Sequence, residues 1–535
     1  MKKILAICLV LMLSLTFFAG CTPKAETSAS KDLVVNIASE PPEMNSITMT
    51  DTVSFSVLRH IIENLTMLDA NDEVVPGVAT DWTVSEDGLT YTFNLRQGMK
   101  WSNGEEVTAN DFVFAWTKLL DPATASEYSY MGYVFANGQA FNEGKATIDQ
   151  VGFKATDDYT LEVTLESPKG YFLSLMSFGV FAPVNQKAYE EIGEAYGTDA
   201  DKIVTNGAYT FTSWEHESKI VLTKNPDFYN VEKIGPDTIT MLMITDASAS
   251  YNSLVAGECD LVGLGTGEIV ELAKAAGYEI HSYDDGSCFY FEYNFADAMM
   301  SNVNLRKAFS YAIDRETMCK VVYANNNQPA SSLTPPGILG ANGSKFQASL
   351  GVVEPFEYNP EKAKEYYAKA CEELGTTDIT IALICDEGDT TAKLAAFLQE
   401  QLKSILGAEL TIEPMPFKSR LERMTNKDFS VVLAGWGPDY NDPMTFLDLW
   451  VTGGGNNHTS CSIAEYDALY AEAQKCTDVD RYFEIMTRLE QIIGEECIIA
   501  PLYWRIRDYA YSDKIAGGVI RTAFQDMNYK YVEFN

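Results

Sequence analysis

Strand-like and helix-like patterns follow one another along the whole of this 535-residue chain, without a low-complexity linker between them. In "GLTYTFNLRQG" (88–98) apolar residues occupy alternate positions, as in a half-buried strand. In "NPEKAKEYYAKACEELG" (359–375) Asn359 is placed as a helix cap, Pro360 as the first helical residue and Gly375 as the stop. Because the two kinds of pattern are interleaved, they indicate an α/β or α+β architecture.

A second helix signal contains large aromatic residues. Thr108 and Asp111 have the spacing of a capping box, and Phe112, Trp116 and Leu119 then fall on one helical stripe. Aromatic residues at this spacing usually pack inward. We therefore expect Trp116, like the nearby Trp101, to belong to the core and not to a ligand site.

The length and the missing linker together suggest how the chain is divided. At about 150 residues per domain, a chain of this size makes about three domains or large lobes. Lobes that are joined without a spacer usually share crossover strands, and a ligand cleft between them is a common result. The sequence therefore favours a cleft whose lobes close on a ligand by a hinge.

The N-terminus has the features of an export signal. Two lysines precede an apolar run at residues 4–18, which is too short to span a bilayer comfortably. The run ends in "FFAGC", which resembles the bacterial lipoprotein cleavage box. We expect residues 1–20 to be removed, Cys21 to be lipidated and residues 21–32 to form a flexible tether.

The formal net charge of −37 excludes some classes of partner. Nucleic acid and anionic lipid both repel such a surface, so the sequence argues strongly against either as a ligand. Contact with the membrane is expected through the lipid anchor only.

Motifs for catalysis, metal and cofactor binding are missing. The four histidines, His60, His216, His281 and His458, are too far apart in sequence for a local metal motif, and we expect surface or hydrogen-bonded histidines. No GxSxG, GxxxxGK[ST], GxGxxG after a strand, or HExxH is present. We expect neither a metal nor a cofactor.

Eight cysteines remain after Cys8 in the signal and Cys21 at the anchor are set aside. None forms a CxxC pair, and spacing alone does not show whether they are free thiols or form one or two disulfides. They are Cys259, Cys288, Cys319, Cys371, Cys385, Cys461, Cys476 and Cys497.

Five stretches together resemble one family. They are "GLTYTFNLRQGMKWSNGEEVTANDFVFAW" (88–116), "KIVTNGAYTFTSW" (202–214), "NVNLRKAFSYAIDRE" (302–316), "YNPEKAKEYYAKA" (358–370) and "GWGPDYNDP" (435–443). As a set they are similar to the oligopeptide-binding lipoproteins of bacterial ABC importers, a class of extracytoplasmic solute-binding proteins. The similarity runs in order from about residue 33 to the C-terminus.

The resemblance implies an α/β, two-lobed, periplasmic-binding-protein-like fold of type II, with an inserted domain and a hinge of two crossover strands. The implied division is residues 33–64, 190–285 and 506–535 for lobe I, residues 65–189 for the inserted domain, and residues 286–505 for lobe II.

The implied function is capture and delivery without catalysis. The protein would bind oligopeptides between its lobes and pass them to a membrane permease powered by cytoplasmic ATPases. It would act as a monomer, anchored by lipid at the outer face of the cytoplasmic membrane or in the periplasmic space.

The "GWGPDYNDP" loop holds acidic residues without a local base, which suits a ligand that brings its own cation. By resemblance Asp439 pairs with the peptide α-amine, and burial would strengthen this charge-assisted contact. Trp436 walls the pocket, and Tyr128 touches the ligand near its N-terminus. The main chain near Thr50 and Thr52 and near Gly435 and Gly437 is expected to bond to the peptide backbone. Tyr440 and Asn441 are expected to orient Asp439. Asp442 and Pro443 are expected to shape the turn.

The chain departs from the family where basic groups meet the peptide carboxylate. The corresponding positions hold Tyr323, Thr391, Met424 and Leu433, none of them basic. Two outcomes stay open: the peptide C-terminus extends into solvent, or nearby basic residues replace the missing ones, the candidates being Lys393, Arg420 and Arg423. Arg306 and Arg315, in a helix of the second lobe, are expected to form ion pairs.

Other functions remain open from the residues alone. A protein of the same superfamily could bind another solute, such as a metal chelate, haem or a sugar. A secreted hydrolase could use paired acids such as Asp439 and Asp442. The glycines of "VTGGGNNH" (451–458) could bind an anion, although we expect a flexible surface turn.

Overall fold

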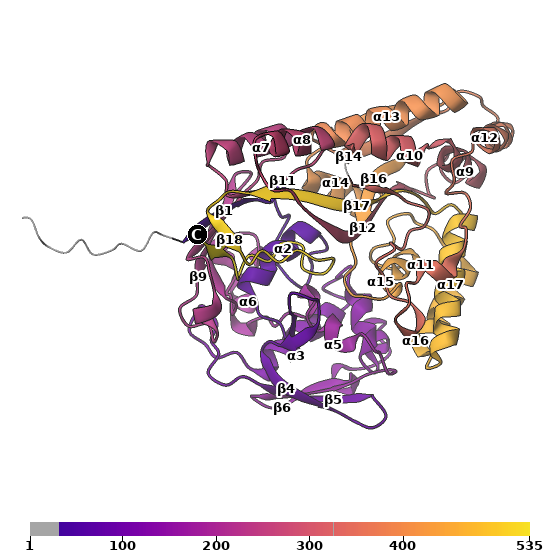
Figure 1. Cartoon of the computed structure of the whole chain (residues 1–535). Coiled ribbons are helices and arrows are strands. Elements are labelled where there is room, and N and C mark those ends of the chain that lie inside the picture. The colour runs from indigo at the N-terminus through magenta and orange to yellow at the C-terminus, as the bar shows by residue number, and fades with distance from the viewer. Residues whose placement is uncertain (1–30, 325) are drawn as a thin grey trace, which may run out of the picture.

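The computed structural model describes residues 31–324 and 326–535. The expected signal peptide, the lipidation site Cys21 and nearly all of the tether lie outside these residues. Figure 1 shows the C-terminus next to the point where the described chain begins.

One large mixed sheet organises the molecule. Its strands lie in the order β15, β14, β16, β12, β17, β11, β1, β10, β9, β8, and β13 pairs with β17 beside this path. Their bounds are β15 Glu409–Met415, β14 Thr380–Asp386, β16 Val431–Trp436, β12 His281–Tyr293, β17 Ile499–Tyr511, β11 Leu261–Gly263, β1 Asp32–Asn36, β10 Thr238–Leu242, β9 Lys219–Lys224, β8 Tyr209–Glu215 and β13 Gln328–Pro329.

The two longest strands, β12 and β17, lie side by side at the centre of this sheet and run antiparallel. β16 and β14 extend the sheet on the side of β12, and β11 and β1 extend it on the side of β17. The register of β12 shifts between Asp284 and Cys288, where Gly286 has a positive φ of 68°. The expected lobe boundaries at 285/286 and 505/506 fall inside these two strands.

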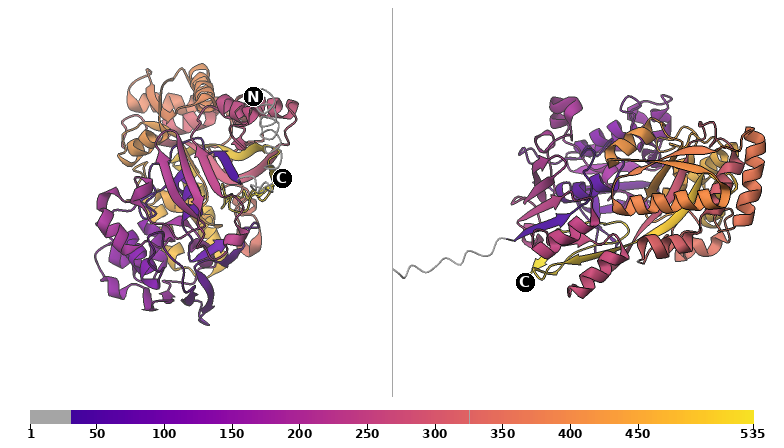
Figure 2. Two further views of the ribbon diagram at one scale, coloured as in Figure 1. Left: turned by 90° about the vertical axis from the view of Figure 1, so that its left-hand side faces the viewer. Right: turned by 90° about the horizontal axis from the view of Figure 1, so that it is seen from above.

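Helices and a second sheet surround the large sheet, as Figures 1 and 2 show. The helices are α2 Thr52–Ile61, α3 Ala109–Leu120, α4 Gly138–Asn142, α5 Phe172–Leu175, α6 Gln186–Ile192, α7 Ala247–Ala256, α8 Gly267–Ala275, α9 Val303–Ala312, α10 Arg315–Met318, α11 Gln347–Leu350, α12 Pro360–Leu374, α13 Asp389–Leu406, α14 Phe417–Thr425, α15 Met444–Leu447, α16 Ala464–Lys475 and α17 Val479–Glu495. The mixed architecture expected from the sequence is confirmed.

The second sheet is antiparallel and lies at the opposite end of the molecule from α13 (Figure 1). Tyr91, Phe93 and Leu95 of its strand β5 are buried, as the alternation predicts. Its strands are β4 Ala79–Val84, β5 Thr90–Leu95, β7 Thr160–Thr164 and β6 Phe153–Asp157; two-stranded ribbons are formed by β2 Thr66–Leu68 with β3 Val74–Pro76, and by β18 Ile515–Gly517 with β19 Glu533–Phe534.

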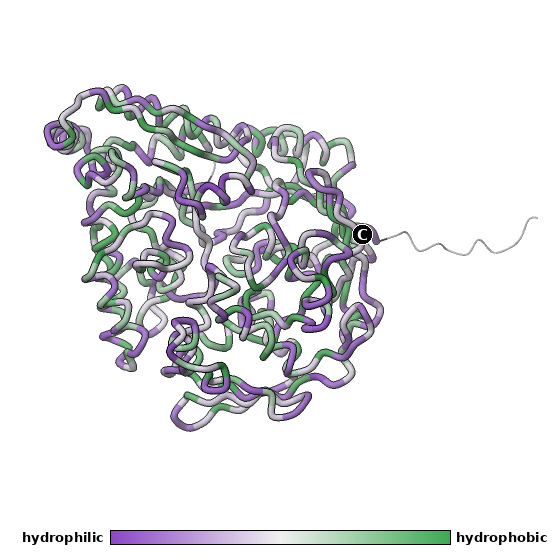
Figure 3. Tube along the Cα trace, turned by 180° about the vertical axis from the view of Figure 1, so that it is seen from behind, coloured by the Kyte–Doolittle hydropathy of each residue, from purple (hydrophilic) through white to green (hydrophobic). Residues whose placement is uncertain are grey.

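The predicted helix caps are present. Thr108 and Asp111 form the capping box of α3, and α12 begins after Asn359 and ends at Gly375 in the left-handed conformation. Trp116 is fully buried on α3, as expected for a core residue. Figure 3 shows how hydrophobic and hydrophilic residues alternate along most segments of the chain.

Among the residues that the structure describes, Arg306 and Arg315 bond to main-chain carbonyls and not to the expected ion-pair partners. Arg306 is buried and donates to the carbonyl oxygens of Met300 (2.6 Å), Ser301 (3.0 Å), Glu496 (2.8 Å) and Cys497 (3.0 Å). Arg315 likewise donates to main-chain carbonyls, among them that of Ser310. A buried guanidinium has five donors in a fixed fork, and here the ends of several elements supply the acceptors.

The eight cysteines named above are all free thiols, and six of them are buried. None of the described helices combines the length and apolar content that a membrane-spanning helix needs. Within the described ranges, no group of three or more histidine, cysteine, aspartate or glutamate side chains is arranged to hold a metal ion.

Candidate functional site

Two adjoining cavities lie where the long strands cross the middle of the molecule. The first encloses about 290 Å³ and the second about 360 Å³. They share Ile37, Ala38, Ser39, Phe289, Asp386, Arg505, Arg507 and Met527 as lining residues. We call the first the main cavity. Together the two have the size of a ligand-binding cleft.

Asp439 lies in the main cavity, on the loop between β16 and α15. Its carboxylate accepts a hydrogen bond from the Tyr128 hydroxyl, at 3.2 Å to Oδ1 and 3.4 Å to Oδ2. Its main-chain N–H donates to Thr445 Oγ1 at 2.9 Å, which fixes the loop. Burial holds the pKa of Asp439 well above its usual value, because the charged form is poorly solvated there.

No arginine or lysine in the described parts of the chain neutralises Asp439; besides burial, only hydrogen bonds from Tyr128 and Thr445 affect its pKa. Arg59 and Arg505 line smaller pockets beside it. However, Arg59 donates to the carbonyl of Phe524 (3.2 Å) and Arg505 pairs with Asp285 (2.6 Å).

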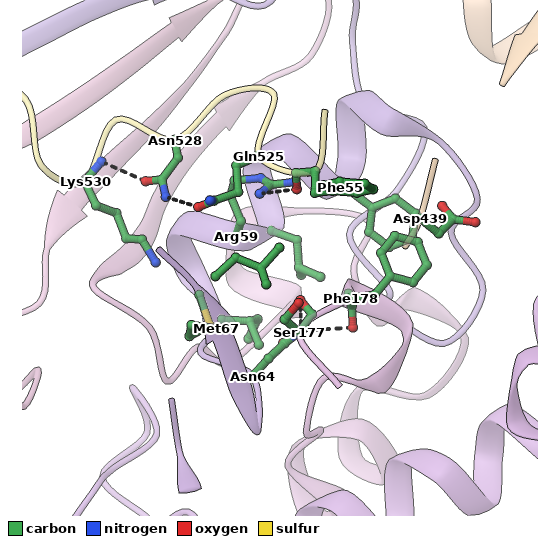
Figure 4. A pocket seen from close by; sticks show the side chains of 15 residues that line it. Phe55, Arg59, Asn64, Met67, Ser177, Phe178, Asp439, Gln525, Asn528 and Lys530 are labelled. Carbon is green, nitrogen blue, oxygen red and sulfur yellow. Dashed lines mark hydrogen bonds between the residues drawn. The ribbon is translucent and has the colours of Figure 1, made fainter. Parts of the chain in front are cut away.

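Figure 4 shows the small pocket that contains Arg59, with Asp439 beside the rings of Phe55 and Phe178 and with Lys530 at the other end. The nearest charge partner of Lys530 is Glu63, at 3.8 Å. The Asp439 carboxylate is thus a poorly solvated acid that a ligand cation would match.

Aromatic side chains wall the space next to Asp439. The rings of Tyr128 and Trp436 lie 6.0 Å apart, and Phe178 packs on the other side of Tyr128 at 5.7 Å. Trp436 Nε1 is buried and has no hydrogen-bond partner in the part of the chain that the structure describes. These residues give Asp439 an apolar surrounding, as the sequence interpretation requires.

The two expected main-chain segments face the same cavity. Thr50 and Thr52 line it at the start of α2, and Gly435 and Gly437 line it at the end of β16. At Gly435 a Cβ atom would stand 2.8 Å from the ring of Phe289. The ring of Phe289 therefore occupies the position that a side chain would take, and glycine permits this close approach to the main chain.

Within the described residues, neither Tyr440 nor Asn441 makes a hydrogen bond to Asp439, so these bonds do not support the expected orienting role. The Tyr440 hydroxyl donates to Asp448 at 3.3 Å and its ring stacks on Tyr171 at 4.7 Å. The side chain of Asn441 accepts from the main-chain N–H of Leu339 at 3.0 Å. Tyr128 and Thr445 hold Asp439 instead.

The expected turn role of Asp442 agrees with its bonds. It accepts from the main-chain N–H of Met444 (2.9 Å) and from the Tyr482 hydroxyl (2.6 Å). Asp442 lines a different pocket from Asp439. The two carboxylates therefore do not share a site, and their geometry gives no support to a hydrolase that uses them as a pair.

Of the three basic residues considered for the peptide carboxylate, only Arg420 lines the main cavity, and it already pairs with Asp386 at 2.6 Å. Arg423 pairs with Glu413 (2.9 Å), and Lys393 lies 4.0 Å from Glu268. Neither of these two lines either cavity.

Sequence reasoning missed two arginines that line both cavities. Arg505 and Arg507, two positions apart on β17, both pair with Asp285 Oδ2, at 2.6 and 2.7 Å. The alternating "RIRDY" of that strand was the available signal. The sequence does not show which face of this strand lines the cavity, so the two arginines could not be assigned to the site.

The segment 451–458 is not simply a surface turn. Its first half is exposed, but Asn456 and Asn457 are buried, and Asn456 and His458 line the main cavity. Glu292 of β12 lines it as well. None of these three cavity residues was among the predicted site residues.

Comparison with known proteins adds independent information. Residues 73–458 match the family model of the bacterial extracellular solute-binding proteins, family 5. The oligopeptide-binding protein OppA of Bacillus subtilis is 32% identical over 93% of this chain and 92% of its own length.

Solved structures agree. The substrate-binding domain of an oligopeptide ABC transporter from Bacillus anthracis aligns with a TM-score of 0.91 at 32% identity, over 95% of this chain and 99% of that one. Listeria monocytogenes OppA bound to peptide aligns with 0.90 at 31% identity and the same coverage. The two-lobed, periplasmic-binding-protein-like fold is confirmed.

The alignments also bear on conformation. A structure of the Escherichia coli murein tripeptide-binding protein MppA aligns with a TM-score of 0.87, whereas the unliganded open form of MppA aligns with only 0.61; both are 26% identical and cover 95% of this chain. The arrangement described here is thus nearer to that of the peptide-bound Listeria protein than to the open one.

Proposed function

Since this chain belongs to family 5 of the bacterial extracellular solute-binding proteins, we propose that its two adjoining cavities bind an oligopeptide by its α-amine and its backbone. The observation that carries the proposal is the Asp439 carboxylate, which is held by Tyr128 in an aromatic surrounding and lacks a basic partner within the described ranges. An α-amine is the cation common to peptides of any sequence.

Main-chain contacts would supply the remaining affinity. The segments at Thr50–Thr52 and Gly435–Gly437 both border the main cavity, and their main-chain groups would bond to the peptide there. Backbone hydrogen bonds of the β type recognise a peptide without reading its side chains. This suits a receptor with several cargoes.

For the peptide C-terminus the proposal turns to Arg505 and Arg507. Both pair with Asp285, and Arg507 also pairs with Asp526 at 3.3 Å. Arg521, which lines the second cavity, lies 3.7 Å from Asp526, so these three arginines face two carboxylates and leave one positive charge in excess. Arg505 and Arg507 line both cavities and lie on the long strand β17. A peptide that runs through the two cavities would place its carboxylate or an acidic side chain near them.

The wider role follows the family. The protein would be exported, anchored by lipid on Cys21, act as a monomer outside the cytoplasmic membrane, and deliver its ligand to an ABC permease with cytoplasmic ATPases. It would catalyse no reaction. Support comes from the export-signal pattern at residues 1–20 and from the peptide-binding relatives.

Calorimetric titration with matched free and N-acetylated peptides tests the proposal. Acetylation should weaken binding to the natural protein, and Asp439→Asn should weaken binding of the free peptide by about 1.5 to 3 kcal/mol, the value of a charge-assisted hydrogen bond. Asp149→Asn, at an exposed carboxylate that lines neither cavity, is the control and should change little. Equal affinity for both peptides would reject the assigned role of Asp439.

A further inference from the structure

One wall of the main cavity carries three buried polar atoms that have no hydrogen-bond partner within residues 31–324 and 326–535. They are Glu292 Oε1, Asn456 Oδ1 and His458 Nε2. Glu292 is 2% and Asn456 5% exposed, and all three residues line the cavity. A buried polar atom without a hydrogen-bond partner destabilises the fold, so such atoms mark a place where a ligand can complete the bonding.

The chain holds these groups in place without a ligand. Glu292 lies on the long strand β12, and Asn456 and His458 lie in the turn that follows Trp450. Asn457 ties this turn together by donating to the carbonyls of Val451 (2.9 Å) and Cys461 (3.0 Å). The acceptors are therefore pre-organised, which lowers the cost of binding.

The charge of this wall is negative. His458 stands between two carboxylates, with Nε2 3.6 Å from Glu127 Oε2 and Nδ1 3.9 Å from Glu292 Oε1. The nearby Arg420 is paired with Asp386 at 2.6 Å. With a protonated imidazole and both carboxylates ionised, one negative charge is left over. Burial raises the pKa of Glu292 to about 7, and a ligand cation would favour its ionised form.

The approach to these acceptors is apolar. Tyr290 lies two residues before Glu292 on β12, so both side chains project from the same face of the strand. The ring of Trp450 packs at 6.0 Å from that of Tyr290, and Met424 lines the same cavity. An apolar approach that ends in buried acceptors fits a side chain with an aliphatic stem and a cationic head.

We propose that Glu292, Asn456 and Glu127 form a subsite that selects a basic side chain, lysine or arginine, of the bound peptide; this rests on the proposed oligopeptide-binding function. The ammonium or guanidinium donates to Glu292 Oε1 and Asn456 Oδ1 while Asp439 holds the α-amine. The cavity then binds two cations of the peptide: the α-amine, which every peptide has, and a basic side chain, which depends on the peptide sequence.

A position scan with calorimetry tests this subsite. Short peptides with a free amine carry arginine or lysine at one position at a time, matched by peptides with the neutral citrulline or norleucine there. At one position the basic peptide should bind about tenfold tighter or more than its neutral match. In Glu292→Gln this ratio should fall towards one, while the neutral peptide keeps its affinity.

Controls separate the outcomes. Glu127→Gln, at a less buried carboxylate, should lower the ratio as well and serves if Glu292→Gln does not fold. Glu86→Gln, at an exposed carboxylate that lines neither cavity, should leave the ratio unchanged. If free-amine peptides bind but the ratio of basic to neutral affinity is near one at every position, the subsite is rejected and the proposed function stands. Absence of binding by every peptide would overturn the proposed function.

Discussion

Buried carboxylates in this protein differ in how well the chain satisfies them. Asp111 accepts bonds from the main-chain N–H of Thr108 (2.8 Å) and from Trp101 Nε1 (3.2 Å). Asp439 is held by a long hydrogen bond from Tyr128 and by Thr445, and burial raises the pKa of Asp439 more than that of Asp111. Asp111 therefore has a structural role that the capping-box spacing predicts, whereas Asp439 is incomplete without a ligand.

The pKa of Asp111 gives a prediction on stability. Burial raises it to about 6 in the folded state, against an ordinary 3.8. The folded protein therefore holds this proton between about pH 4 and pH 6, so the contribution is complete below pH 4 and is lost as the pH rises through 6. A shift of this size corresponds to about 3 kcal/mol.

Asp111→Asn should remove this part of the pH dependence. The asparagine oxygen still accepts the bonds of Thr108 and Trp101 but does not titrate. Melting temperatures measured from pH 4 to pH 8 should decline less steeply in the variant than in the natural protein. The exposed Asp87→Asn serves as the control, and identical slopes for Asp111→Asn and the natural protein would contradict the assignment.

Gly435 gives a second prediction at this scale. An added Cβ would meet the ring of Phe289 at 2.8 Å, and that ring is stacked on Tyr503 with centroids 4.9 Å apart, so it has little freedom to turn away. Gly435→Ala should therefore narrow the cavity and weaken peptide binding about tenfold, in line with the cost of overpacking.

Calorimetry measures the change. Gly170→Ala is the matched control, because a Cβ there meets nothing within 4 Å. Unchanged affinity in Gly435→Ala would show that the close approach at Gly435 does not limit the cavity.

At the scale of elements, the sequence predicts what is decided locally. The caps of α3 and α12 depend on residues three or four positions apart, and the alternation of β5 depends on its own residues, so both could be recognised. The carbonyl partners of Arg306 and the neighbours of Asn441 come from distant segments. Charge suggested ion pairs for Arg306. Asn441 was expected to orient Asp439, whereas its side chain accepts from the main-chain N–H of Leu339.

The binding site shows the same limit. Asp439 and Trp436 could be named because family resemblance applies to one short loop. Arg505, Arg507 and Glu292 could not, because their side chains reach the cavity only through the pairing of β12 with β17 and β16. The register between these strands, and the face of each strand that lines the cavity, are tertiary properties that the pattern of a single strand does not contain.

Arg306 provides the prediction for elements. It joins the start of α9 to the end of α17 through four carbonyl bonds, and its guanidinium lies 3.8 Å from the ring centre of Phe295. Arg306→Lys keeps the charge but has fewer donors and no planar fork. The variant should lose about 2 to 4 kcal/mol of unfolding free energy, because buried carbonyls are left unpaired.

Urea unfolding followed by circular dichroism measures this loss. Lys307→Gln, the next residue on the same helix and partly exposed, should change the unfolding free energy by no more than about 0.5 kcal/mol. Equal effects of the two substitutions would show that the carbonyl bonds of Arg306 contribute little.

For the whole molecule, burial of the Asp439 carboxylate destabilises the closed arrangement when no ligand is present. Closing around Asp439 removes water from a carboxylate that lacks a basic partner in the described chain, and the raised pKa expresses that cost. Opening returns the carboxylate to solvent. A ligand cation lowers the cost of closing, so the same residue links binding to the hinge at β12 and β17.

This coupling predicts a response to pH as well as to peptide. Because the closed form holds the Asp439 proton more tightly, the ligand-free protein should close as the pH falls, and its radius of gyration from small-angle X-ray scattering should decrease from pH 8 to pH 5. Asp439→Asn has no charge to desolvate, so without ligand it should be more compact than the natural protein at pH 8 and should respond less to pH. Asp149→Asn, at an exposed carboxylate outside both cavities, should behave like the natural protein. Equal radii for the natural protein and Asp439→Asn at every pH would mean that the buried acid does not oppose closure. Another residue would then have to couple ligand binding to the hinge.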